Sequence, residues 1–384
     1  MTTNNQHHYS SRRASVAAAP ALQLRNSLLR ISCAVSLKVL LLIVLGVPFL
    51  RPLAVSAHEV YVLDHAEISR ALTTDSPNPF SVLPEQEKLF LTYGAAIAFG
   101  VIIILFLSVS PLFERVCNPW LSKLKPWAPL IARVTLGLSI IASGYYGAIF
   151  GPELPLTQIV SPDFVPLLGI VLVYAGVFIM LGLLTRIVSV LGVILFAILI
   201  CVDHTYMLTY ASYLGEFILF VILGGGAHSL DEHVPFLNKV DNYSKKFRKR
   251  LEPYSFLIMR ILFGVSVFFA SFYSKFLHSN LALATVTEYH LTDFFHFTPL
   301  FLVLGAFLVE AAIGAFVALG IELRLVAIVF TFFLTLSIAF FGESVWPHVI
   351  LFGVNLALFC HGYDRYTVES AVLSAARQKG EPVL

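Results

Sequence analysis

Residues 297–342 read FTPLFLVLGAFLVEAAIGAFVALGIELRLVAIVFTFFLTLSIAFFG, and this stretch decides the fold. Its only charged residues are Glu310, Glu322 and Arg324. A helix that crosses the hydrocarbon core of a bilayer needs roughly 17–25 apolar residues. The stretch holds two such runs, 297–321 and 324–342, separated by a tight link at Arg324. It therefore predicts two membrane-spanning helices joined by a short turn.

The same pattern extends over most of the chain. Of its 384 residues, 58% are hydrophobic and 12% are charged, whereas soluble domains are about 25% charged. We therefore predict an all-α polytopic membrane protein with lipid as its main solvent, and about nine transmembrane helices. The predicted spans are 90–112, 127–149, 164–184, 187–203, 207–227, 255–274, 297–321, 324–342 and 345–361.

The start of the chain has the features of an export signal. Residues 1–30 are polar and basic, an apolar run follows at 37–50, and Val55-Ser56-Ala57 places small residues before a cleavage point. This pattern predicts a signal peptide over 1–57 that is cleaved after Ala57. An uncleaved anchor is the alternative. Both place the polar segment 58–89 outside the cytoplasm, ahead of an extra span at 90–112.

Basic residues set the predicted orientation, because cytoplasmic loops collect Lys and Arg. With the mature N-terminus outside, the cytoplasmic side receives the basic linker 232–254 and the tail 370–384. The outer segments receive only Arg70, Lys88 and Lys275. The basic residues on the cytoplasmic side are Arg115, Lys123, Lys125, Arg186, Lys239, Lys245, Lys246, Arg248, Lys249, Arg250, Arg324, Arg365, Arg377 and Lys379. The asymmetry predicts a multi-pass protein of the cytoplasmic membrane with its C-terminus inside.

The sequence also repeats itself. Leu181-Gly-Leu-Leu-Thr-Arg186 resembles Leu319-Gly-Ile-Glu-Leu-Arg324, an offset of 138 residues, and Arg133-Val-Thr-Leu-Gly137 resembles Arg260-Ile-Leu-Phe-Gly264, an offset of 127. The difference predicts an insertion in the first outer loop of the second copy. Residues 127–231 and 255–369 are thus predicted to be two four-helix units. An even number of spans gives both units the same orientation, so the repeat is parallel.

Each copy resembles the DoxX family of four-helix membrane proteins. The resemblance covers about 220 residues. The second copy matches at Arg260, Gly264, Lys275, Glu310, Gly314, Gly320 and Arg324, with a looser ending at Glu369. The first copy matches at Arg133, Gly137, Gly182, Arg186 and the ending Ser229-Leu230-Asp231, but has Ala148 and Leu172 in place of the Lys and the Glu. The resemblance implies kinship with membrane subunits of thiosulfate:quinone oxidoreductases and of redox-stress or metal-linked complexes.

Charged residues inside spans are the candidate site, because burying a charge in lipid is costly. The second copy has Arg260 and Glu310, with Lys275 at the outer end of its first helix. The first copy has Arg133 and Glu216. We hypothesise that each Arg meets the Glu of its own unit. Such a pair would fix helix register or line a polar pocket for a quinone or a proton path. Alternatively, the Arg extends toward the head groups.

Histidines gather in the predicted outer segments. His278, His290 and His296 share one loop with Glu288 and Asp293, and this combination could bind copper, zinc or iron. If cleavage follows Ala57, His58 becomes the new N-terminus, where its amine and imidazole could chelate copper with His65. No histidine lies in the middle of a predicted span, so a cytochrome b type of haem protein is not expected.

Three functions remain open at this stage. The first is a membrane subunit of a quinone-linked redox complex, supplied with electrons by a partner outside, whether or not the chain is itself an enzyme. The second is a small-molecule transporter, which two parallel repeats and intramembrane charges suit. The third is a structural scaffold for a membrane complex. The sequence shows no nucleotide-binding motif and nothing that indicates a nucleic-acid partner.

Overall fold

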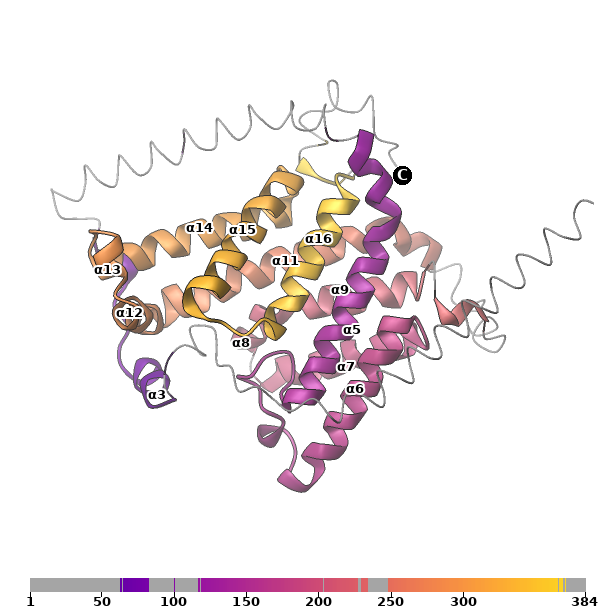
Figure 1. Ribbon diagram of the computed structural model, residues 1–384, viewed down its shortest axis with the longest axis horizontal. Coiled ribbons are helices and arrows are strands. Elements are labelled where there is room, and N and C mark those ends of the chain that lie inside the picture. Colours follow the sequence, from indigo (N-terminus) through magenta and orange to yellow (C-terminus); the bar gives the residue numbers. More distant parts are fainter. Residues whose placement is uncertain are drawn as a thin grey trace, which may run out of the picture. The chain divides into compact units, whose positions relative to one another are not determined.

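The computed structural model describes residues 65–82, 119–202, 204–226, 229–233, 248–364 and 366–368, with residues 63, 100, 117 and 370 singly (Figure 1). Every regular element within these ranges is a helix, and the only β-type pairing in them is the bridge between Ala148 and Pro155. The predicted signal peptide or anchor, all but one residue of the span 90–112, and most of the basic linker and tail lie outside the described residues.

The predicted all-α membrane architecture is confirmed. Six described helices are long and apolar enough to cross a bilayer: Pro119–Tyr146, Pro162–Leu181, His204–Leu223, Arg248–Leu277, Pro299–Leu319 and Leu323–Phe341. Two shorter apolar helices, Thr185–Cys201 and Trp346–His361, fall where the spans 187–203 and 345–361 were predicted. The described chain is therefore a multi-pass helical membrane protein.

In chain order, the long helices can be described as two groups of four. The first group is α5 (Ala128–Tyr146), α6 (Val165–Leu181), α7 (Thr185–Val202) and α9 (Ala211–Leu223), with the short α8 (His204–Met207) before α9. The second group is α11 (Ser255–Ser271), α14 (Pro299–Leu319), α15 (Leu323–Phe341) and α16 (Val349–His361). Proline opens α14 and a left-handed Gly320 (φ 71°) ends it, the expected start and stop residues of a helix.

In each group the first and second helices cross at closely packed glycines. A Cβ added to Gly137 on α5 would lie 2.7 Å from the carbonyl oxygen of Gly176 on α6. In the second group a Cβ on Gly314 of α14 would lie 2.7 Å from the carbonyl oxygen of Gly264 on α11. Small residues allow membrane helices to approach closely, so these four glycines bring α5 against α6 and α11 against α14.

Backbone conformation also recurs at the offset of 138 residues. Gly182 and Gly320 have φ of 70° and 71°, and Gly224 and Gly362 both have φ of 72°. The non-glycine residues Leu184 and Glu322 are both left-handed, with φ of 52° and 50°. Left-handed conformations are uncommon outside glycine. The link after the second helix and the end of the fourth helix are therefore built alike in both groups.

The two groups contact each other through their first and last helices. α9 of the first group packs along α11 of the second, and α16 of the second packs along α5 of the first (Figure 1). At these contacts the Ser266 hydroxyl donates to the carbonyl of Thr209, and Tyr146 stacks on Trp346 with ring centroids 5.1 Å apart. The first–last pairing is reciprocal, as expected for two similar units side by side.

The first connection of the second group is the longest. After α11 comes a π-helical turn, Phe272–Leu277, then α12 (Ser279–Glu288) and α13 (Leu291–Phe294). The N-terminal helix α3 (His65–Thr73) packs on α12 (Figure 1), and the Ser279 hydroxyl donates to the carbonyl of Pro77 at 2.6 Å. The described part of the segment predicted to be extracytoplasmic thus covers this connection.

Candidate functional site

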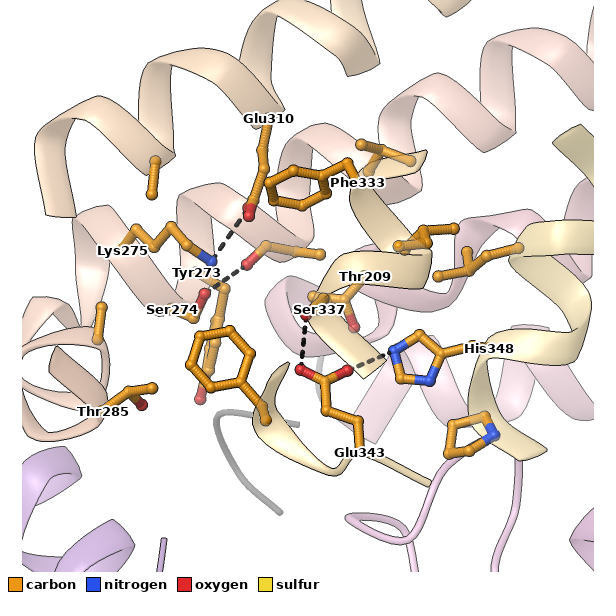
Figure 2. Close-up of a pocket in the computed structure, with 18 of the residues that line it drawn as sticks. Thr209, Tyr273, Ser274, Lys275, Thr285, Glu310, Phe333, Ser337, Glu343 and His348 are labelled. Atoms are coloured by element: carbon orange, nitrogen blue, oxygen red, sulfur yellow. Dashed lines mark hydrogen bonds and ion pairs between the residues drawn. The ribbon is translucent and has the colours of Figure 1, made fainter. Parts of the chain in front are cut away.

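A cavity of about 660 Å³ lies between the second helical group and the end of the first (Figure 2). Its wall comes from the segments around α9, α11 and α12 and from α14, α15 and the start of α16. The volume is in the range of sites for small organic ligands, which are commonly apolar with a few polar groups. The wall here is of that kind, with aromatic and aliphatic side chains around a small set of charged ones.

One polar cluster is the ion pair of Lys275 and Glu310. The Lys275 Nζ lies 3.0 Å from the Glu310 Oε2, and the two side chains are 9% and 16% exposed. Figure 2 shows them pointing toward each other across the cavity from two elements. Lys275 lies in the π-helical turn, where the backbone departs from α-helical register. π-Turns inside helices are frequent at functional sites, and this turn carries the lysine that meets Glu310.

The second polar cluster joins α15 to the start of α16. The Ser337 hydroxyl donates to Glu343 Oε1 at 2.8 Å, and the His348 Nε2 lies 2.9 Å from Glu343 Oε2 (Figure 2). The other ring nitrogen of His348, Nδ1, is 2.8 Å from the carbonyl oxygen of Ser344. Glu343 and His348 are both buried. Three hydrogen-bonding contacts therefore fix this carboxylate and this imidazole at the cavity wall.

The His348 contacts determine where protons must be. A carbonyl oxygen only accepts hydrogen bonds, so Nδ1 must carry a proton toward Ser344. Nε2 and the Glu343 oxygen would repel each other if neither carried a proton, so a further proton lies on one of the two. The pair is either imidazolium with carboxylate or neutral imidazole with carboxylic acid. Both forms hold the same number of protons.

The first helical group supplies the third acidic side chain of the wall. Tyr210 donates a hydrogen bond from its hydroxyl to Glu153 Oε2 at 2.6 Å. Both residues line the cavity, together with Thr209 and Ser212. The site is therefore shared between the two groups, with its cation and its imidazole from the second.

Part of the rim is apolar and exposed. Phe294 on α13 is 65% exposed, and Phe340 and Leu336 on α15 are each 50% exposed. All three line the cavity. On a membrane helix an exposed apolar side chain faces lipid. Leu336 and Phe340 therefore indicate that the cavity can be reached from the hydrocarbon region.

The predicted pairing of Arg260 with Glu310 is wrong. Arg260 Nη1 lies 3.9 Å from Asp364 Oδ1, and Nη2 donates to the carbonyl of Tyr366 at 3.1 Å. Arg260 thus holds the segment after α16, close to Gly320 at the far end of α14. The pairing was predicted because the unit holds one intramembrane Arg and one intramembrane Glu, but Glu310 lies ten residues before Gly320, about 15 Å along the helix.

The predicted pairing of Arg133 with Glu216 is wrong as well. Arg133 donates from Nη1 to the carbonyl of Gly225, just beyond the end of α9. Glu216 is fully buried, and within the described ranges no group donates a hydrogen bond to either of its carboxylate oxygens. Glu216 does not line the cavity. Of the five predicted polar residues, only Lys275 and Glu310 belong to the site.

The Ser-Leu-Asp ending has a structural role in the first group. Asp231 accepts from the backbone N–H of Leu184 at 2.7 Å and of Thr185 at 3.3 Å. Carboxylates at a helix start satisfy N–H groups that lack a partner within the helix. This aspartate therefore caps α7 and does not take part in the cavity.

The loop histidines predicted as a metal site are not gathered into one. No group of three His, Cys, Asp or Glu side chains in the part of the chain that the structure describes could hold a metal ion. His278 packs on Tyr273 with ring centroids 4.6 Å apart, and burial lowers its pKa; His290 and His296 are exposed. His58 and the side chain of His65 lie outside the described parts, so the copper prediction stays a prediction.

Sequence reasoning missed Glu343, His348 and Glu153 as site residues. Glu343 and His348 stand in Gly-Glu-Ser-Val-Trp-Pro-His, residues 342–348, between two apolar runs. A carboxylate and an imidazole five residues apart, around a helix break, were the available signal. Glu153 lies in a connection of the first group, and no local sequence pattern indicates that it lines a cavity together with residues of the second group.

Comparisons with protein-family models, with curated proteins and with solved structures find no match for this chain. The resemblance to the DoxX family rests on the sequence motifs alone and stays a prediction.

Proposed function

We propose that the protein is a DoxX-like membrane subunit that binds a quinone in the cavity of its second helical group. The observation that carries the proposal is a largely apolar cavity of about 660 Å³ whose wall bears two fixed polar pairs, Lys275–Glu310 and Glu343–His348. A quinone is neutral and flat, with two carbonyl oxygens that accept hydrogen bonds. The Lys275 ammonium and the protonated Glu343–His348 pair are donors of the kind those oxygens need.

The charges of the wall favour a neutral ligand. Lys275 is matched by Glu310, and the Glu343–His348 pair with its shared proton is neutral overall, which leaves Glu153 as the remaining acid. The wall therefore has a net negative charge. An anionic ligand would be repelled by it, because like charges repel strongly in a low-dielectric site. The exposed apolar rim agrees with this choice, because quinones reach their sites from the lipid.

In this proposal the electrons come from a redox partner subunit on the outer side, as the resemblance to quinone-linked complexes implies. The cavity lies toward the helix ends that carry residues 278–298 and 342–348, which the distribution of Lys and Arg predicts to be outside. The partner would bind over α12 and α13, next to the quinone.

We further propose that residues 127–231 and 255–369 are two copies of one four-helix unit in the same orientation. Equivalent glycine crossings, equivalent left-handed residues and the reciprocal packing of first and last helices support the repeat. A ninth span at 90–112, after a signal peptide or anchor over 1–57, completes the proposed topology in the cytoplasmic membrane.

A small-molecule transporter is the second candidate. The observation that favours it is that both helical groups contribute to the cavity, since transporters with internal repeats bind substrate between the repeats. Flux of a neutral or cationic solute into liposomes that contain the purified protein would support this candidate. A scaffold role would leave both quinone binding and flux at background.

Extraction of bound quinone tests the main proposal. Protein purified in mild detergent should contain quinone, and the Glu310→Gln variant should lose most of it, because the Lys275 ammonium is then no longer held by a carboxylate. Glu288→Gln changes an exposed glutamate of α12 and is the matched control. Wild-type protein without quinone, both as purified and after incubation with a decyl-substituted benzoquinone, would refute the proposal.

A further inference from the structure

Glu343 and His348 have a role in the cavity that the proposed quinone function does not itself assign. We propose that they form the proton donor of the site, holding one exchangeable proton that passes to an oxygen of the bound quinone. The inference rests on the proposed function for its substrate. Its structural basis is independent of that function, because it follows from the hydrogen-bond geometry of His348.

The anchoring of His348 is what makes the second proton transferable. Nδ1 is committed to the Ser344 carbonyl at 2.8 Å, so only Nε2 and the facing oxygen of Glu343 share the mobile proton. Ser337 donates to the other carboxylate oxygen at 2.8 Å and stabilises the carboxylate once the proton has left. The pair can therefore lose one proton to a ligand without any side chain having to rotate.

Three other donors in or beside the cavity are already engaged within the protein. Lys275, from the turn after α11, is 3.0 Å from Glu310 of α14, and loss of its proton would leave that carboxylate without a cation. Tyr210 of the first group already donates to Glu153. Tyr289, between α12 and α13, donates to the Phe341 carbonyl at 3.2 Å. His348 is the one imidazole among the described lining residues.

The pair also lies where it can be reprotonated. Glu343 follows Gly342, which ends α15, and lies in the connection to α16. This connection is at the predicted outer end, near water. A proton lost to the ligand can therefore be replaced from the aqueous side through the same two residues.

Reduction of a quinone to a quinol takes two electrons, both supplied by the redox partner protein, and two protons. The pair gives its shared proton to one quinone oxygen and becomes neutral imidazole with carboxylate. It then takes a proton from outer water and gives that proton to the second quinone oxygen as the second electron arrives. The quinol leaves, and a last proton from water restores the pair.

Infrared difference spectroscopy on an electrode tests this proposal, because the electrode replaces the redox partner. Purified full-length protein would be loaded with a decyl-substituted benzoquinone, and spectra of the oxidised and reduced states compared. We expect signals of the pair, from its carboxyl group or its imidazole ring, that change with quinone reduction in wild type and are absent in Glu343→Gln. Loss of a general acid commonly slows a reaction by about 100-fold or more, so reduction of the bound quinone should slow by about that factor in the variant. Glu288→Gln should behave like wild type.

The outcomes separate the two proposals. A wild-type film that takes up no quinone would overturn the proposed function together with this role. A film of the Glu343→Gln variant that binds quinone and shows the wild-type signals and rate would overturn the proton donor alone. If Glu343→Gln does not fold, Ser337→Ala replaces it, since that variant removes only one hydrogen bond to Glu343. Unshifted signals of the pair in Ser337→Ala would then also overturn the proposal.

Discussion

The two helical groups share a framework and differ in what fills it. Both cross at a pair of glycines, and both have left-handed residues at the same relative positions. Where the second group has Lys275 and Glu310, the aligned positions of the first are Ala148 and Leu172, and both are buried. Backbone contacts therefore define the scaffold in both groups, while a few side chains determine whether it carries a polar site.

An aromatic cluster follows Ala148 in the first group. Phe150 is buried and left-handed, with φ of 65°. Its ring stacks on Tyr213 with centroids 4.2 Å apart and contacts the rings of Phe196 and Phe217. The first group therefore fills the end that carries residues 148–156 with aromatic side chains. The second group has a cavity there, with charged residues on its wall.

Of the substitutions that test this difference between the groups, removal of one charge of the Lys275–Glu310 pair should lower stability most. Breaking a buried ion pair by removal of one partner costs about 3–5 kcal/mol, because the other charge stays buried alone. We expect Lys275→Ala to destabilise the protein by an amount in that range in detergent unfolding experiments. The double variant Lys275→Ala/Glu310→Leu reproduces the residues of the first group and should regain most of this stability without binding quinone. A double variant as unstable as Lys275→Ala would contradict the comparison.

The second largest loss of stability is expected from substitutions at the glycine crossings that both groups share. Gly314→Ala puts a Cβ 2.7 Å from the Gly264 carbonyl, and overpacking of this kind costs about 1–3 kcal/mol. Gly176→Ala should give a similar loss, because a Cβ there would lie 2.7 Å from the backbone nitrogen of Ile141 and the crossing is equivalent. Gly305→Ala, on the same helix as Gly314, meets nothing within 4 Å and is the control. Thermal melting of the three variants in one detergent tests the prediction, which fails if Gly305→Ala is the most harmful.

Substitution of Arg260 tests whether the helix ends near Gly320 and Asp364 are independent of the cavity at the opposite ends. Arg260→Gln removes contacts to Asp364 and to the Tyr366 carbonyl, and loss of a hydrogen bond to a charged group costs about 1.5–3 kcal/mol. We expect lower stability with unchanged quinone binding at saturating quinone. Arg133→Gln should show the same separation in the first group. A loss of quinone binding at unchanged stability would return Arg260 to the site.

The smallest expected effect is on the titration of Tyr289. Burial raises the pKa of Tyr289, with smaller contributions from Glu288 and Glu343. A raised pKa favours the protonated phenol in the folded state. Ionisation of this residue therefore leaves the free energy of unfolding unchanged below a pH of about 10 and lowers it above. Ultraviolet titration should show the phenolate of Tyr289 forming only above the pKa of free tyrosine. Glu343→Gln should lower this pKa slightly, and a large fall would show that burial is not the main cause.

The sequence predicted where the described helices α14 and α15 begin and end, but not how the helices are rotated about their axes. The spans 297–321 and 324–342 correspond to α14 and α15 to within two residues at each end, because proline, glycine and apolar length mark helix ends. The partner of Arg260 could not be predicted, since depth along a helix does not say which face a side chain occupies. Lys275 and Glu310 were both named, but their pairing depends on a π-helical turn that periodicity does not reveal. Glu343 and His348 come together only when the chain breaks between α15 and α16.

The exposed phenylalanine and leucine side chains at the rim have a consequence for how affinity should be expressed. A lipophilic molecule is concentrated in the bilayer by its own partitioning, before it meets the protein. The protein then has to distinguish the bound molecule from the same molecule dissolved in lipid, and the apolar tail gains little from that exchange. Selection depends on the head group, and the occupancy of the cavity follows the mole fraction of ligand in the membrane, so dilution with detergent empties the site and enrichment of the bilayer fills it.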